Sequence, residues 1–466
     1  MISVSGLVKH RLLILGILLL GAGLRLHQGT ANVRFHPDEA LYTAYARRAA
    51  VYGDWLLNAP VDKPPLSIYA NALGLHFFAA RTYTVIDIPL RTGEFAAKTP
   101  NIFSGVVLIA LVYALARQLY PKQTHIAWFA ALITALSPYA VAFSASAFTD
   151  MLMLSWMLAA LLAALHHKPG WAGSMVALSI WTKPQGILFL PLTLWFMGWR
   201  GISRFLLVLG VGIISLWLWD AIRPQVSFWV LGAAHINPGR IISSPMEWLP
   251  RLQNWLNHCQ QLLGAPWINW LLIVLVIFTG FKHRHPHDLK LFLMVSGYFV
   301  FHWLNAYPTF DRYMLPMVPL LAILAARAIP NHYMPIATLL IMMSLFSRYN
   351  PRQDALHGQN PDTLINLATW LDSKPLGTII YNPWLGWEME YYRGAWSNKR
   401  WVYYPNAMIQ AQDAQLNPDP APRYFIIPFD HVHDPQTWLQ ALIDAGFVVQ
   451  LAYAQGGFHI YELIPP

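Results

Sequence analysis

Eleven runs of apolar residues, separated by polar connections, constrain this chain more than any other feature. A helix rises 1.5 Å per residue, so about 20 apolar residues cross the roughly 30 Å hydrocarbon core of a bilayer. Several runs are shorter than this, but their number predicts a polytopic α-helical membrane protein with about eleven spans. At Lys183-Pro184 two interpretations stay open, two short spans with a tight outer turn or one kinked helix. The runs lie at about 12–26, 101–119, 125–143, 148–165, 171–182, 185–199, 204–222, 266–281, 290–304, 313–328 and 333–347.

Charged residues are too few for a soluble protein. They make up 11% of the 466 residues, against about 25% in soluble domains, while 56% of the chain is hydrophobic. The net charge is +9, with the basic residues mostly in the short connections. Topology and anionic lipid headgroups account for this charge, so membrane lipids are expected partners and nucleic acid is not. Cys259 is the only cysteine, which excludes an internal disulfide and a cysteine-rich metal cluster.

Basic residues fall in alternate connections, which orients the predicted spans. The positive-inside rule assigns these connections to the cytoplasm, with the ten-residue stretch 281–290 as the clearest marker. With eleven spans, the N-terminus is then cytoplasmic and the C-terminus extracytoplasmic, in the plasma (inner) membrane. The orienting residues are Lys9, Arg11, Arg117, Lys122, Lys168, Arg200, Arg204, Lys282, Arg284, Lys290 and Arg327.

The composition changes after Ser347 and predicts a second domain. Residues 1–347 form the membrane module, with long outer loops at 27–100 and 223–265, and long loops are often functional. Residues 350–466 alternate helical and extended patterns, which predicts a small extracytoplasmic α/β domain. The predicted helices are Asp362–Leu371 and Pro435–Ala445, and the predicted strands are Thr378–Tyr381, Tyr424–Pro428, Val448–Tyr453 and His459–Leu463.

The sequence His36-Pro37-Asp38-Glu39 follows the first apolar run and carries two neighbouring acids. One interpretation is a helix start, with proline in the first turn and carboxylates favoured by the helix dipole. The functional interpretation is a catalytic pair at the membrane surface. There Asp38 removes a proton from an acceptor hydroxyl, while Glu39 orients a partner or an ion.

Asp62-Lys63-Pro64-Pro65 lies in the same outer loop. Its simplest interpretation is a polar turn stiffened by two prolines. In the functional interpretation Asp62 and Lys63 bind substrate, because a lysine on a stiff backbone is suited to stabilise a departing phosphate.

Three further positions lie at the predicted outer ends of apolar runs. Asp150 is either an ordinary helix-start acid or a catalytic acid, because acids at membrane depth usually face a cavity. Lys183 is either a lysine reaching for the interface or a substrate-binding cation. Arg312 and Tyr313 either anchor a helix end or hold a phosphate.

No motif indicates a cofactor. The chain has neither a G-x-x-x-x-G-K-[ST] nor a G-x-G-x-x-G sequence for nucleotide binding, and no HExxH pair. We therefore expect no required cofactor and no obligatory metal, although dependence on a divalent metal stays open.

Acidic and basic candidates on one side of the membrane favour an enzyme, but two other classes stay open. A transporter or lipid flippase also carries charged residues in its substrate path, although no inverted repeat is visible here. A non-catalytic membrane scaffold whose outer domain binds a partner is the third class.

The order of five motifs resembles bacterial polyprenyl-phosphate-sugar glycosyltransferases of the GT-C superfamily, in the branch that contains lipid A aminoarabinose transferases and protein O-mannosyltransferases. The resemblance covers residues 1–347. The motifs are HPDEALY from residue 36, DKPPL from 62, FTDMLM from 148, WTKPQGILFLPL from 181 and DRYMLPMVPLLAIL from 311.

The resemblance implies a GT-C fold and an inverting transfer from an undecaprenyl- or dolichyl-type phosphate sugar to a lipid, glycan or protein acceptor. It implies that Asp38 is the base or orients the acceptor and that Asp150 lies near the reacting sugar. Lys63 then lies beside the donor phosphate, with a contribution from the Arg312-Tyr313 region. Related enzymes often have a phosphate-binding arginine in a region matching 223–265, where Arg240 and Arg251 are the candidates.

Overall fold

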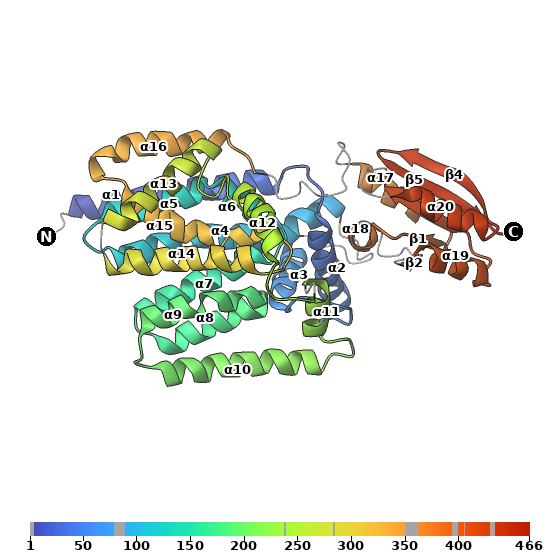
Figure 1. Cartoon of the computed structure of the whole chain (residues 1–466), viewed down its shortest axis with the longest axis horizontal. Helices are drawn as coiled ribbons and strands as arrows, with labels where there is room; N and C mark the ends of the chain where they lie inside the picture. Colours follow the sequence, from blue (N-terminus) through green and yellow to red (C-terminus); the bar gives the residue numbers. More distant parts are fainter. Residues whose placement is uncertain are drawn as a thin grey trace. The chain divides into compact units, whose positions relative to one another are not determined.

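The computed structural model of the chain is mostly helical and ends in a small β-sheet (Figure 1). It describes residues 4–78, 89–236, 239–282, 285–349, 362–393, 399–404, 406–428 and 434–466. The chain divides into two compact units. Unit 1 comprises Met1–Ala31, Tyr45–Phe77 and Phe95–Pro351, and unit 2 comprises Asn32–Ala44, Phe78–Glu94 and Arg352–Pro466.

Each of the eleven apolar runs is helical. Two helices, α2 (Pro37–Tyr52) and α4 (Leu90–Leu119), begin in unit 2 and continue in unit 1. The other helices of unit 1 are α1 (Val4–Gly29), α3 (Leu66–Phe78), α5 (Thr124–Leu136), α6 (Pro138–Ser144), α7 (Asp150–Leu165), α8 (Pro169–Thr182), α9 (Leu190–Met197), α10 (Ile202–Ala221), α11 (Phe228–Ile236), α12 (Pro245–His258), α13 (Pro266–Lys282), α14 (Pro286–Leu304), α15 (Met317–Ala328) and α16 (Met334–Met342). Short 3₁₀ helices lie at η1 (Pro184–Phe189), η2 (Asp311–Met314), η3 (Asn331–Tyr333) and η4 (Met343–Phe346).

The expected eleven spans are not confirmed. Within the described residues, three helices are long and apolar enough to cross a membrane: Arg11–Gly29, Leu90–Leu119 and Ile202–Ala221. The number rises to five if two bent pairs each count as one span, Thr124–Leu136 with Pro138–Ser144 (60°) and Met317–Ala328 with Asn331–Phe346 (104°). Several other apolar runs form continuous helices that are shorter than a full span, such as α7 with 16 residues and α8 with 14, so hydropathy alone gives a larger number than helix length does.

The region around Lys183 holds two short helices. Lys183 has extended backbone (φ −161°, ψ 133°) between the end of α8 and the start of η1. Helix α8 lies between α7 and α10 (Figure 1). Gly173 allows this close packing, because a Cβ atom there would lie 2.7 Å from the carbonyl oxygen of Phe205 in α10.

Arg25 of α1 is fully buried and joins α1 to the bent pair α5–α6. It donates to the carbonyl oxygens of Thr134 and Ala135 (both 3.2 Å) and to Ser144 Oγ (3.1 Å). The two carbonyls lie in the last turn of α5, where Pro138 prevents the helix from continuing and leaves acceptors without intrahelical donors. The guanidinium therefore caps a helix end inside the membrane module.

Unit 2 contains a five-stranded mixed sheet in the order β2-β1-β3-β5-β4. Strand β1 pairs in parallel with β2 and β3, while β5 pairs antiparallel with β3 and β4. The four predicted strands correspond to β1 (Ile379–Tyr381), β3 (Arg423–Pro428), β4 (Val448–Gln455) and β5 (Phe458–Ile464), and the two predicted helices to α17 (Thr363–Asp372) and α20 (Pro435–Asp444). The prediction missed β2 (Arg400–Val402), α18 (Gly386–Tyr392) and α19 (Ala407–Leu416).

Candidate active site

Asp150 is the first residue of α7, and its position is fixed by the loop before it. The side-chain amide of Asn101 donates to the carbonyl oxygens of Ser146 (2.8 Å) and Phe148, and Asn71 reaches that of Ala147 (3.4 Å). These contacts satisfy the carbonyls of a buried loop that has no ladder of its own. They also hold the start of α7, where the carboxylate of Asp150 is 2% exposed.

Lys183 forms a buried ion pair with Asp150. Its Nζ lies 2.6 Å from Asp150 Oδ1, and the two side chains are 3% and 2% exposed. The same Nζ lies 4.9 Å from the centre of the Tyr313 ring, and the charges of Arg312 and Lys63 also act on it. Five predicted site residues from different parts of the sequence therefore gather in unit 1.

A cavity of about 370 Å³ lies beside this group. Its lining is polar at Asp62, Lys63, Gln185, His302, Tyr307 and Tyr313, and mainly apolar at Pro184, Ile187, Leu188, Phe228, Trp229, Gly232, Ala233 and Phe301. Lys63 forms an ion pair with Asp62, and both side chains are about 90% buried. The following residues, Pro64 and Pro65, are also buried, so Lys63 is carried on a backbone with little freedom.

Arg312 lies against two aromatic rings. Its guanidinium is 5.1 Å from the ring centre of Phe148 and 4.6 Å from that of Phe310. Such stacking holds the planar cation in place while its N–H groups keep their donor capacity. Tyr313, the next residue, lines the cavity directly.

His302 is a cavity residue that the sequence reasoning missed. Its ring lies 2.9 Å from the carbonyl oxygen of Tyr298 through Nδ1 and packs edge-on against Trp255 at 5.8 Å. A lone histidine within an apolar run carries no pattern that separates a cavity residue from a core residue. What distinguishes His302 from a core histidine is its place in the structure, where it lines the cavity together with Tyr307 and Tyr313.

The arginines of the second outer loop contact backbone carbonyls or acids. Arg251 donates to the carbonyl oxygens of Trp303 (3.1 Å), His302 (3.3 Å) and Tyr307 (2.8 Å), and thereby supports the cavity wall from behind. Arg240 pairs with the half-exposed Glu247. Neither arginine is among the residues that line the cavity.

Asp38 and Glu39 belong to unit 2 and form the start of α2. The carboxylate of Glu39 accepts a hydrogen bond from the His36 N–H (2.9 Å), and the Asp38 N–H contacts His36 Nδ1 (3.2 Å). Glu39 is fully buried. It therefore caps the helix and fixes the backbone that carries Asp38.

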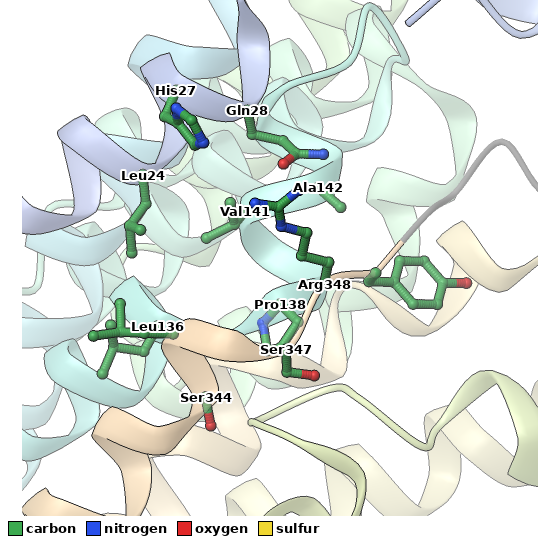
Figure 2. A pocket seen from close by; sticks show the side chains of 12 residues that line it. Leu24, His27, Gln28, Leu136, Pro138, Val141, Ala142, Ser344, Ser347 and Arg348 are labelled. Atoms are coloured by element: carbon green, nitrogen blue, oxygen red, sulfur yellow. The ribbon is translucent and has the colours of Figure 1, made fainter. Parts of the chain in front are cut away.

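A second cavity, of about 170 Å³, lies in unit 1 and contains none of the predicted site residues. Figure 2 shows the side chain of Arg348 pointing toward His27 and Gln28 of α1, with Leu24 and Leu136 to one side. This cavity is separate from the group around Lys183.

The described residues include no cluster of three or more His, Cys, Asp or Glu side chains arranged to hold a metal ion.

Residues 62–219 match the family model of the dolichyl-phosphate-mannose-protein mannosyltransferases. This segment contains Lys63, Asp150 and Lys183. No curated protein matches the chain.

The fold is similar to that of solved membrane glycosyltransferases. ArnT from Cupriavidus metallidurans bound to undecaprenyl phosphate superposes with a TM-score of 0.64 at 15% identity, over 99% of this chain and 98% of ArnT. AglB, the oligosaccharyltransferase of Archaeoglobus fulgidus in complex with an inhibitory peptide and a dolichol-phosphate, gives 0.60 at 12% identity, over 98% of this chain and 74% of AglB. The arabinofuranosyltransferase AftD from Mycobacteria gives 0.51 at 14% identity, over 96% of this chain and 40% of AftD. Residues 62–219 thus match a mannosyltransferase family model, and the chain as a whole shares the fold of these solved glycosyltransferases.

Proposed function

We propose that the chain transfers a sugar from a polyprenyl-phosphate donor to a hydroxyl of a cell-envelope acceptor, with inversion at the anomeric carbon. The observation that carries this proposal is the cavity between Lys63 and the apolar wall formed by Ile187, Leu188 and Trp229. It combines a buried cation with apolar surface, which is the chemistry of a phosphate attached to an isoprenoid chain.

The relatives of known structure support this class of donor. ArnT has been solved with undecaprenyl phosphate and AglB with a dolichol-phosphate, both of them phosphates on isoprenoid lipids. A cavity of about 370 Å³ accommodates a sugar phosphate and the first isoprene unit, while the remaining lipid lies along the membrane module.

The charges around the cavity suit the proposed reaction. Cleavage of the bond between the anomeric carbon and the phosphate oxygen leaves an electron-poor sugar and adds a negative charge to the phosphate. Lys63 faces the phosphate in this scheme, and Asp62 orients Lys63. Arg312 and Tyr313 add a cation and a hydroxyl donor on the same side.

The remaining candidates act on the sugar and the acceptor. In the proposed reaction Asp150, held by Lys183, faces the sugar on which positive charge develops. Asp38 removes the proton from the acceptor hydroxyl as it attacks the anomeric carbon opposite the phosphate, which inverts the configuration. Glu39 keeps Asp38 in place through the cap of α2.

The proposed location follows the charge distribution of the sequence. Residues 1–347 form the transferase module in the plasma (inner) membrane, and residues 350–466 form an extracytoplasmic domain. The active site then faces the same side as this domain, where a lipid-linked donor meets a lipid, glycan or protein acceptor.

The test is a reconstitution of wild-type protein and Asp38→Asn with a panel of radiolabelled polyprenyl-phosphate sugars. We expect both proteins to bind one donor, and only the wild type to consume it, because the amide lacks the basic oxygen that takes the proton. Full turnover by a correctly inserted Asp38→Asn protein would remove Asp38 from the base role. Absence of binding across the panel would favour transport, which a liposome flux assay measures.

A further inference from the structure

Helix α18 packs directly on the segment that carries Asp38. The ring of Tyr391 meets that of Phe35 edge-on at 4.9 Å, and Tyr392 Oη accepts a hydrogen bond from the Phe35 N–H at 2.8 Å. Tyr392 also donates to Glu94, which forms a buried ion pair with Arg34 at 3.0 Å. All of these groups belong to unit 2, so the start of α2 and α18 share one packed core.

Glu388 lies on the face of α18 that makes these contacts. It precedes Tyr391 by three positions and Tyr392 by four, which is the spacing of one helix face. Its side chain is 1% exposed, and its Oε1 atom has no hydrogen-bond partner among the described residues. A carboxyl group buried in this way is costly unless it is neutral or has a partner in the working state.

Among the charged groups described, Asp38 is the one that acts on Glu388. Other charged groups of this unit interact with residues other than Glu388: Glu94 pairs with Arg34, Asp362 with Arg91 and Glu390 with Arg393, while the charge of Asp372 acts on Lys399. The pKa of Glu388 is raised to about 7, mainly by burial and further by the charge of Asp38, against the lowering effect of a hydrogen bond from its own backbone N–H. At neutral pH a large share of Glu388 therefore carries a proton.

We propose that Glu388 is a positioning residue for Asp38, whose carboxylate accepts a hydrogen bond from the protonated carboxyl group of Glu388. This inference rests on the proposed role of Asp38 as the base. The shared hydrogen bond has two effects: it fixes the orientation of the Asp38 carboxylate toward the acceptor, and it keeps Asp38 ionised beside a buried surface. Glu388 thus links the C-terminal part of the chain to the chemistry at the start of α2.

The sign of the pH effect follows from the proton on Glu388. Below the pKa of Glu388 its carboxyl group donates and Asp38 stays oriented. Above it, two carboxylates face each other, the hydrogen bond is lost and the repulsion moves Asp38 out of place. Turnover of the wild type should therefore fall as the pH rises through about 7.

The decisive variant is Glu388→Gln, compared with wild type in pH profiles of kcat/KM for the donor between pH 6 and 9. The neutral amide is a permanent donor of nearly the same shape, so we expect activity to be kept and the fall above neutral pH to disappear. Glu388→Leu has no donor, and we expect its kcat to be roughly 100-fold below that of the wild type at pH 6, with donor KM unchanged and no fall through neutral pH; a misplaced catalytic group causes an effect of this size. Glu390→Gln is the matched control on the exposed side of the same helix, and it should keep the wild-type profile.

The outcomes separate this inference from the proposed function. Turnover by Asp38→Asn would overturn the base role of Asp38, and with it the role of Glu388. An inactive Asp38→Asn together with a Glu388→Gln profile that still falls like the wild type would overturn the positioning role alone. A wild-type profile that is flat from pH 6 to 9 would do the same. If Glu388→Leu fails to fold, the profiles of Glu388→Gln and wild type decide.

Discussion

The ion pair between Asp150 and Lys183 permits a test of whether the candidate site serves stability or chemistry. The two side chains are 2% and 3% exposed and 2.6 Å apart, so neither charge has water as an alternative partner. Removal of one member of such a pair leaves a buried charge without compensation, which typically costs about 3–5 kcal/mol. Replacement of both members by apolar residues of similar size is often neutral or stabilising.

We therefore expect Asp150→Asn and Lys183→Met each to lower the free energy of unfolding by about 3–5 kcal/mol. Asp150→Asn has an added effect, because the ammonium group of Lys183 then loses its opposite charge and is still repelled by the like charges of Arg312 and Lys63. The double variant Asp150→Leu/Lys183→Met should lie close to wild type in stability, so the coupling between the two positions is large.

The assay uses the single cysteine of the chain. Cys259 is 4% exposed, so a thiol-reactive fluorophore reports its exposure as purified protein unfolds during a denaturant titration in mild detergent. Glu247→Gln is the matched control, because it breaks an ion pair with Arg240 whose side chains are 45% and 37% exposed and should change stability far less.

Sugar transfer by the double variant then decides the role of the pair. A stable but inactive double variant supports the proposed roles in the reaction. Full activity would show that the pair only stabilises the fold and would remove Asp150 and Lys183 from the site. If Asp150→Asn and Lys183→Met are as stable as Glu247→Gln, the argument that loss of one member of this buried pair is strongly destabilising is wrong.

Two further predictions concern the walls of the cavity. Lys63→Ala should weaken donor binding at least tenfold, because it removes the buried cation that faces the phosphate in the proposed reaction. Equilibrium binding of radiolabelled donor measures this, and unchanged affinity would contradict the assignment. Arg251→Ala removes three hydrogen bonds to carbonyl oxygens behind the cavity and should lower the free energy of unfolding by about 2 kcal/mol, measured by the same Cys259 titration; a variant as stable as wild type would show that these contacts do not hold the wall.

The helices and most of the sheet were predictable because they follow simple patterns. Apolar runs marked eleven helical regions, and alternating residues marked four of the five strands. The missed elements are short and have weak patterns. Strand β2 has three residues and no buried one, and α18 has seven residues with two acids and two tyrosines. The number of spans was less predictable. The single run 125–143 is bent by 60° near Pro138, while the runs 313–328 and 333–347, counted as two, lie in helices bent by 104° that pass the length test only together.

The residues of the candidate site were predictable from the sequence only where a charged side chain lies at the end of an apolar run. Asp150 and Lys183 both lie at the ends of apolar runs, so the predicted topology put them at one membrane face, and in the structure they are in contact although 33 positions separate them. His302 and Glu388 had no such pattern. His302 lies inside an apolar run, and Glu388 lies in an element that was missed. Their surroundings depend on tertiary packing: the His302 ring packs against Trp255, and Tyr391 of the helix that carries Glu388 packs against Phe35.

The pairing of acids with lysines at the candidate site affects two steps of the proposed reaction, the breaking of the sugar–phosphate bond and the release of the product. A polyprenyl-phosphate sugar is a phosphodiester with one negative charge, and its transfer leaves a monoester with up to two. Lys63 is already paired with Asp62, and Lys183 with Asp150, so the cations are partly neutralised before the donor binds. Unpaired cations in a buried site would hold the more highly charged product most tightly and slow its release. Pairing weakens this ground-state attraction but leaves each ammonium with donors that strengthen their bonds as negative charge develops. Asp62 and Asp150 therefore suit turnover as well as stability. By pairing with the lysines they weaken binding of the charged product, while the lysines can still stabilise the negative charge that develops in the transition state.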